Sequence, residues 1–107
     1  MTPELKARID NMVNSQKIFV FMKGTKLMPM CGFSNNVVQI LNSLAVPFET
    51  FDVLEDPEIR QGIKDYSSWP TIPQVYINGE FIGGSDVVIE LYQKGELQQV
   101  VEVALAS

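Results

Sequence analysis

The chain contains no histidine and a single cysteine, Cys31, among its 107 residues. Structural zinc sites use mixtures of Cys and His ligands, so one copy of this chain lacks the donors for a zinc site of the usual kind. A lone cysteine also excludes an intrachain disulfide framework, and a reducing compartment, the cytoplasm, is therefore expected. Any disulfide or multi-sulfur metal site must take further sulfur from outside the chain.

Long apolar runs and an excess of positive charge are also missing. The run Ile18–Met22 is far too short to cross a bilayer, and no signal-peptide pattern opens the chain. Scattered Lys and Arg and a net charge of -5 argue against a nucleic-acid surface. We therefore expect no membrane and no nucleic-acid partner. The composition, 46% hydrophobic and 20% charged, predicts one globular domain over residues 1–107.

Hydrophobic spacing and helix-start signals predict an alternating order of elements. A first helix begins at Thr2-Pro3-Glu4, and the β-branched and aromatic run 18–22 is typical of a central buried strand. Apolar residues at helical spacing after Cys31 predict a helix, and a second strand follows around 48–53. Asp56-Pro57-Glu58 indicates the start of a third helix.

The second half of the chain predicts a hairpin and two helices. Asn78-Gly79 between two apolar triplets is a strong signal for a tight antiparallel turn. Ser85-Asp86 is suited to cap a helix that stops at Gly95, and 96–105 reads as a final short helix. Such an order predicts an α/β fold of thioredoxin-like arrangement, a mixed four-stranded sheet with helices on both faces.

Cys31 falls where a loop meets a predicted helix. Unpaired N–H groups and the positive end of the helix dipole favour thiolate over thiol there, which makes Cys31 a candidate nucleophile. The alternative is a small buried hydrophobic residue. Ser34 stands where a C-x-x-C pair would carry its second sulfur, and serves either as a weak polar contact or as a cap. Neighbouring Phe33 is more often structural in such a place.

Four segments, in this order, together carry a resemblance: Phe21-Met22-Lys23-Gly24, Pro29-Met30-Cys31-Gly32-Phe33-Ser34, Trp69-Pro70-Thr71-Ile72-Pro73-Gln74 and Gly83-Gly84-Ser85-Asp86. The chain resembles a single-domain monothiol glutaredoxin of the CGFS type over almost its whole length. The loop between Lys23 and Cys31 is similar to the insertion that separates this type from dithiol relatives. The resemblance implies the glutaredoxin fold and a site for glutathione, whose carboxylates and amine need charged partners.

Each implied glutathione ligand has a plainer alternative. Lys23 and Arg60 are implied to bind a carboxylate; otherwise Lys23 is a solvated lysine and Arg60 pairs with a nearby acid. Ser85 and Asp86 are implied to bind the other end of the tripeptide, unless they only cap a helix. The Ile72 backbone, in a loop that resembles the family's segment before a cis proline, is implied to pair with the glutathione backbone. Trp69 is either a wall of that groove or simply buried.

Three functions remain open from the residues. Two chains, each with Cys31, and two glutathione thiolates would supply the four sulfurs of a 2Fe-2S cluster. Alternatively, Cys31 attacks a glutathione mixed disulfide and a second glutathione releases it, which would make the protein an oxidoreductase, at most a weak one. A thioredoxin-fold adaptor without sulfur chemistry is the third. The resemblance favours cluster binding and transfer, because CGFS glutaredoxins generally carry clusters and are poor reductases.

The resemblance also implies partners, and two positions depart from its pattern. It implies a homodimer when the cluster is bound, a monomer when apo, and BolA-like proteins and apo iron-sulfur acceptors as partners. Ser85 replaces a cysteine that many relatives carry, so an intramolecular disulfide with Cys31 is excluded. Met30 stands where polar residues are common, and either packs at a dimer interface or shields a cluster from water.

Overall fold

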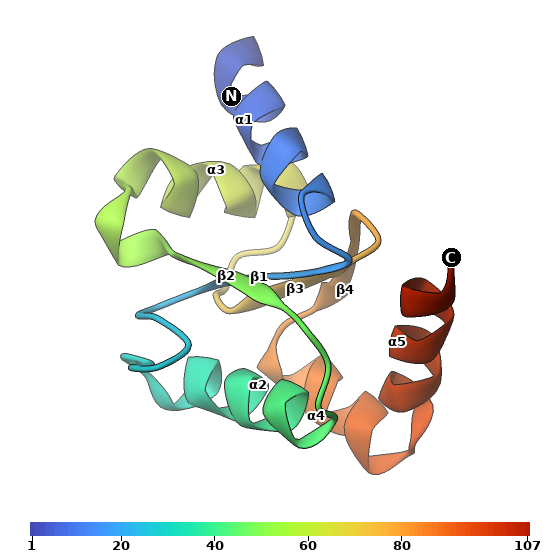
Figure 1. Cartoon of the computed structure of the whole chain (residues 1–107). Helices are drawn as coiled ribbons and strands as arrows, with labels where there is room; N and C mark the ends of the chain where they lie inside the picture. Colours follow the sequence, from blue (N-terminus) through green and yellow to red (C-terminus); the bar gives the residue numbers. More distant parts are fainter.

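The structure is a computed structural model that describes residues 1–107, built on one mixed sheet (Figure 1). The strands are β1 (Ile18–Met22), β2 (Glu49–Asp52), β3 (Gln74–Ile77) and β4 (Glu80–Gly83). The helices are α1 (Pro3–Asn14), α2 (Gly32–Ser43), α3 (Pro57–Ser67), α4 (Ser85–Gln93) and α5 (Glu96–Ala106), with a 3-10 turn, η1, over Val53–Glu55.

The sheet has the order β2-β1-β3-β4. β1 runs parallel to β2 and antiparallel to β3, and β3 and β4 form the hairpin at Asn78-Gly79, where both turn residues have positive φ. The predicted α/β fold of thioredoxin-like type is therefore confirmed, including the parallel pair joined to an antiparallel hairpin.

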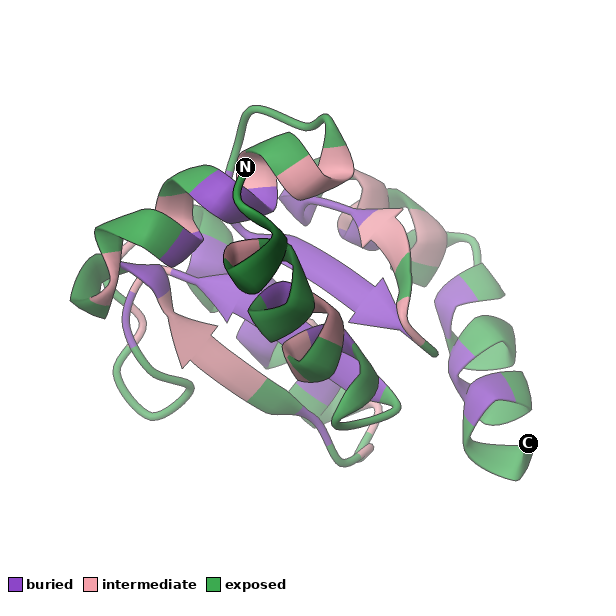
Figure 2. Ribbon diagram, turned by 90° about the horizontal axis from the view of Figure 1, so that it is seen from above, coloured by how far each residue is buried: buried purple, intermediate pink, exposed green.

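Helices cover both faces of the sheet, as predicted (Figure 1). Alternate residues of β1 enter different clusters: Val20 packs with apolar residues of α2, α4 and α5, whereas Phe21 packs with those of α1 and α3. Figure 2 shows the buried central strands between exposed outer helix surfaces. None of the helices is both long and apolar enough to cross a membrane.

The predicted side-chain caps of α1 and α3 are present, whereas that of α4 is not. The Thr2 side chain caps α1 and the Asp56 side chain caps α3. By contrast, the prediction that Ser85-Asp86 caps α4 is wrong. Gly84 is the N-cap residue of α4, and Ser85 is its first helical residue, so this helix start has no side-chain cap. A glycine before a serine can adopt the extended cap conformation itself, so the serine side chain is left free for another partner.

The second strand is shorter than the segment 48–53 suggested. It ends at Asp52, and Val53 begins η1. The Asp52 side chain accepts a hydrogen bond from the Leu54 amide at 2.9 Å and so caps this turn. A local side-chain bond of this kind competes with continued strand pairing.

Candidate functional site

Cys31 is the N-cap residue of α2. Its backbone is extended, with φ -152° and ψ 157°, and its sulfur accepts a hydrogen bond from the Ser34 amide at 3.3 Å. The thiol is half-buried and makes no disulfide. The predicted loop-to-helix position is confirmed, and it leaves the sulfur in contact with the helix N-terminus.

Ser34 connects this sulfur to the end of β1. Its hydroxyl lies 3.2 Å from Cys31 Sγ and also accepts a hydrogen bond from the Lys23 amide at 3.1 Å. Ser34 is fully buried. It is therefore a polar contact of the thiol, whereas the cap itself is the cysteine.

The surroundings favour the ionised form of Cys31. Partial burial opposes ionisation, but hydrogen bonds from the Ser34 hydroxyl and from the Ser34 and Phe33 amides outweigh it, with help from the Lys23 charge. Together they hold the pKa of the Cys31 thiol below its ordinary value. The buried-hydrophobe alternative is disfavoured by this geometry.

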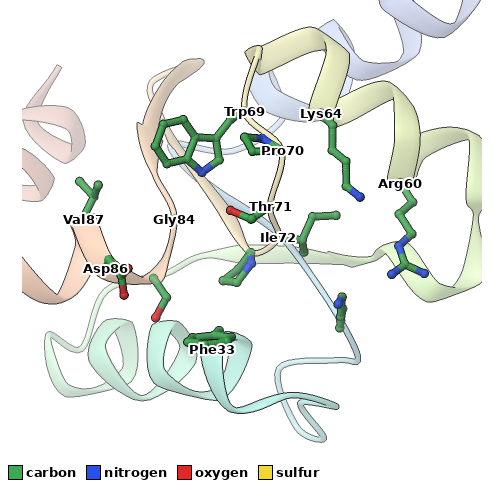
Figure 3. A pocket seen from close by; sticks show the side chains of 13 residues that line it. Phe33, Arg60, Lys64, Trp69, Pro70, Thr71, Ile72, Gly84, Asp86 and Val87 are labelled. Atoms are coloured by element: carbon green, nitrogen blue, oxygen red, sulfur yellow. The ribbon is translucent and has the colours of Figure 1, made fainter.

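A cavity of about 380 Å³ opens beside α2, within the usual size range of small-ligand sites (Figure 3). The loop that precedes β3, the exposed face of α3 and the start of α4 form its walls. Five of the six predicted site residues line it: Lys23, Arg60, Ile72, Ser85 and Asp86. Cys31 does not line it, but it lies next to residues that do: it is two positions from Phe33 and shares the Ser34 hydroxyl with the Lys23 amide.

The Lys and Arg side chains that have no partner elsewhere in the protein line this cavity. Of the 8 Lys and Arg residues, those that form salt bridges are Lys6, Arg8, Lys26 and Lys94. Lys17 donates to the Ser107 carbonyl. The remaining cations, Lys23, Arg60 and Lys64, all line the cavity. Unpaired cations gathered in one hollow of an acidic protein are suited to an anionic ligand.

The alternative for Arg60, a salt bridge with a neighbouring acid, is not found. Asp56 instead binds Arg8 of α1 at 2.7 Å, and that bond holds the pKa of the Asp56 carboxyl below its usual value. Glu55 and Glu58 form no salt bridge either, so Arg60 is left without an acidic partner. In Figure 3 its guanidinium and the Lys64 ammonium lie on one side of the cavity, with Asp86 on the other.

The start of α4 contributes an unsatisfied hydroxyl. Ser85 is 6% exposed, and its Oγ is a buried polar atom without a hydrogen-bond partner. Buried polar groups are nearly always paired, so an unpaired one that lines a cavity indicates a missing ligand atom. Residues of the first turn of α4, whose N–H groups have no partner within the helix, also line the cavity, which further favours an anion there.

The loop before β3 presents backbone to the cavity. The Ile72–Pro73 bond is cis, and neither the amide nor the carbonyl of Ile72 takes part in a hydrogen bond within the chain. The Gln74 side chain, fully buried, holds this loop by donating to the carbonyls of Trp69 and Thr71, each at 3.2 Å. Trp69 lines the cavity and remains 40% exposed.

Sequence reasoning missed two features of this site. Lys64 was not singled out; its only signal was its spacing of four from Arg60, which places both on one face of α3. Phe33 was interpreted as structural, but it is 61% exposed and lines the cavity. Met30 is 62% exposed beside Cys31.

The site offers little to a metal from one chain. No group of three or more Cys, Asp or Glu side chains is arranged to hold an ion. Cys31 is the one sulfur donor, half-buried and free. A metal group that needs several thiolate ligands would fit this site only if a second chain or a bound ligand supplied the others.

The sheet order, a cysteine at the N-cap of the helix after β1 and a cis proline before β3 define the class: a protein of thioredoxin-like fold with a single thiol at a helix start. The glutaredoxin family profile matches residues 18–82. A protein of Synechocystis sp. named as a ycf64-like monothiol glutaredoxin is 76% identical over 107 residues, covering 100% of both chains. The chain belongs to the glutaredoxin family, among the monothiol glutaredoxins.

Other relatives extend this finding. The chloroplastic monothiol glutaredoxin-S7 of Oryza sativa is 57% identical over all of this chain and 64% of its own length. The solution structure of reduced poplar apo GrxS14 is 57% identical with a TM-score of 0.87, covering 99% of this chain and 97% of that one. The crystal structure of the holo form of glutaredoxin C1 from Populus tremula x tremuloides is 25% identical, with a TM-score of 0.88 over 97% and 92%. Because some relatives are named chloroplastic, the cytoplasmic location stays a prediction.

Proposed function

We propose that the protein binds glutathione in the cavity, holds a 2Fe-2S cluster between two copies of the chain, and passes this cluster to acceptor proteins. Glutathione binding is supported by one observation: the three cations without partners, Lys23, Arg60 and Lys64, all line the cavity that lies beside the only thiol, that of Cys31. Membership of the glutaredoxin family also supports glutathione binding.

The distribution of charge in the cavity matches that of glutathione. The tripeptide has a carboxylate at each end and an ammonium beside one of them. Lys23, Arg60 and Lys64 are assigned to the glycine carboxylate, since guanidinium and ammonium groups bind carboxylates strongly. The free N–H groups of α4 and the unpaired Ser85 hydroxyl receive the other carboxylate, and Asp86 receives the ammonium.

The middle of the peptide would meet the loop before β3. Ile72 has a free amide and a free carbonyl, the pair that an extended peptide needs in order to add as a strand. With its ends held between α3 and α4, glutathione would direct its thiol toward α2, where Cys31 lies. Trp69 and Phe33 supply apolar walls.

The cluster part of the proposal rests on the sulfur donors. A 2Fe-2S cluster takes four thiolates, and one chain offers Cys31 alone. Two chains and two bound glutathiones complete the set. The cluster is cargo, and the non-covalent glutathione thiolates allow it to leave. This sharing of donors implies a homodimer when the cluster is bound and a monomer when apo. Delivery to apo iron-sulfur proteins or to BolA-like partners is proposed from membership of the family alone. The holo form known for a relative of 25% identity supports a bound group.

Anaerobic reconstitution with iron, sulfide and glutathione tests the cluster. We expect visible cluster absorption together with a shift to dimer size, both lost in Cys31→Ser or when glutathione is omitted. A colourless monomer from the unsubstituted chain would overturn this part of the proposal.

Titration of Trp69 fluorescence with glutathione tests the cavity separately, because this single tryptophan lines it. Arg60→Gln and Lys64→Gln should each weaken binding by about threefold to tenfold. Lys94→Gln is the matched control, since it removes the same charge from a lysine that pairs with Glu90. Equal weakening by all three substitutions would indicate a general charge effect and contradict the assignment.

The lowered pKa of Cys31 favours a second candidate function, glutathione-dependent reduction of mixed disulfides. The Cys31 thiolate would attack the glutathionyl sulfur, form a disulfide with it and release the substrate thiolate. A second glutathione thiolate would then displace Cys31 and leave as glutathione disulfide. Turnover of a glutathionylated peptide that vanishes in Cys31→Ser would support this activity. Turnover that persists would exclude it.

A further inference from the structure

The backbone at Lys23 and Gly24 is fixed by hydrogen bonds from three separate segments. The Lys23 amide donates to Ser34 Oγ at 3.1 Å, and the Lys23 carbonyl accepts from the Met30 amide at 2.9 Å. The Gly24 amide donates to Asp52 Oδ1 at 2.9 Å. The amide and carbonyl of Lys23 and the amide of Gly24 are thus bound, while the Lys23 ammonium is left without a partner.

The Asp52 bond comes from the strand next to β1. Met22, the last residue of β1, is in register with Asp52, the last residue of β2, so the carboxylate reaches just past the end of the sheet. There it accepts from the Gly24 amide and, through the same oxygen, from the Leu54 amide. One atom therefore connects the loop after β1 to the turn that leads into α3, the helix that carries Arg60 and Lys64.

The loop has no room to compensate for the loss of this bond. Gly24 has a φ of +88°, and a Cβ there would collide with the Met28 carbonyl and the Met30 amide that fold back over it. Gly24 is buried. A buried amide deprived of its acceptor costs free energy, and the chain can recover it only by moving Gly24, and with it Lys23.

We infer that Asp52 is a positioning residue for anion recognition: by fixing Gly24, it sets the direction from which Lys23 enters the cavity. The inference rests on the proposed binding of glutathione. Asp52 does not line the cavity and acts through Lys23. Its own charge is unfavourable to an anionic ligand, so the two effects of its removal have opposite signs. Loss of the hydrogen bonds weakens glutathione binding, whereas loss of the charge alone strengthens it.

Glutathione titrations of four variants, read by Trp69 fluorescence, separate these effects. Asp52→Ala should weaken binding about fivefold, whereas Asp52→Asn, which keeps the acceptor oxygen without the charge, should bind within about twofold of the unsubstituted chain. Lys23→Ala should weaken binding about tenfold. The double variant Asp52→Ala/Lys23→Ala should bind no more weakly than Lys23→Ala, because a residue that acts through Lys23 has nothing left to position.

Tyr66→Phe controls for general destabilisation. It removes the hydrogen bond between Tyr66 and Asp10 that joins α3 to α1, away from the cavity, and should leave affinity unchanged despite lower stability. Additive losses in the double variant, or equal weakening by Asp52→Asn and Asp52→Ala, would overturn the inference. So would unchanged or tighter binding in Asp52→Ala. If the unsubstituted chain does not bind glutathione, the proposed function fails first and the inference falls with it.

Discussion

The sulfur of Cys31 and the amide of Ser34 lie 3.3 Å apart, so that the cysteine caps the helix it precedes. Sulfur is a weak acceptor as a thiol and a strong one as a thiolate, and the cap is therefore stronger when Cys31 is ionised. Ser34 adds its hydroxyl to the same sulfur and holds the Lys23 amide. One buried serine thus links the nucleophile, the helix start and the end of β1.

Substitution Ser34→Ala should shift the pH dependence of Cys31 alkylation. The thiolate is the deprotonated form, so a lowered pKa moves the alkylation midpoint below that of a free cysteine, and loss of the Ser34 hydroxyl moves it back to higher pH. Iodoacetamide rates across a pH series measure the midpoint. Ser43→Ala, at the far end of α2, is the control and should not move it. An unchanged midpoint in Ser34→Ala would contradict the assigned role.

Two glycines of the same region should respond in opposite ways to alanine. Gly24 has a φ of +88° and no space for a Cβ, so Gly24→Ala should lower the free energy of unfolding by about 2 kcal/mol. Gly32, in the first turn of α2, would place a Cβ in open space. Gly32→Ala should be neutral or stabilise by up to about 1 kcal/mol. Urea unfolding of both variants measures the difference.

Gly32→Ala also tests whether the missing side chain at Gly32, the residue after Cys31, keeps the sulfur accessible. If the fold is intact but alkylation of Cys31 slows, the side chain obstructs access to the sulfur. If both stability and alkylation are unchanged, Gly32 has no role at the thiol.

Alkaline pH should weaken the contact between α1 and α3. Burial and the Asp10 carboxylate, which accepts a hydrogen bond from the Tyr66 hydroxyl at 2.6 Å, raise the pKa of Tyr66 to about 12 from its ordinary 10.0. Because the folded pKa is the higher one, this stabilisation is complete below pH about 10 and is lost as pH rises through about 12.

Tyr66→Phe removes this contribution, about 1 kcal/mol, from the free energy of unfolding at neutral pH. Urea unfolding of both proteins should therefore give a difference at neutral pH that shrinks toward pH about 12. A difference that is constant with pH would mean that the hydroxyl contributes by packing and not through its proton.

The helices and strands could be predicted from the sequence, whereas several contacts within the site could not. Periodicity and turn chemistry were sufficient for β1, the Asn78-Gly79 hairpin and the cysteine at the start of α2, because these depend on neighbours in sequence. The unpaired state of Arg60 was not predictable, since it depends on Arg8 taking Asp56, a contact across 48 positions. The unpaired Ser85 hydroxyl likewise required knowing that Gly84, one residue earlier, is the cap.

The same limit applies to Gln74, whose sequence position in β3 gives no hint of its partners. Its amide nitrogen donates to the carbonyls of Trp69 and Thr71, and its Oε1 accepts from the Tyr76 hydroxyl at 3.1 Å. The Gln74 side chain itself is fully buried. These bonds hold the loop that presents Ile72 to the cavity. A buried amide with three bonds of this kind has no apolar substitute.

Gln74→Met keeps the size of the side chain but leaves three polar groups without partners, and should lower the free energy of unfolding by about 2 to 3 kcal/mol. It should also weaken glutathione binding, because the loop that carries Ile72 loses its anchor. Urea unfolding and Trp69 fluorescence titration measure the two effects. Gln98→Met, on the exposed face of α5, is the matched control and should change neither. Normal glutathione affinity in a destabilised Gln74→Met would show that the loop keeps its conformation without this anchor.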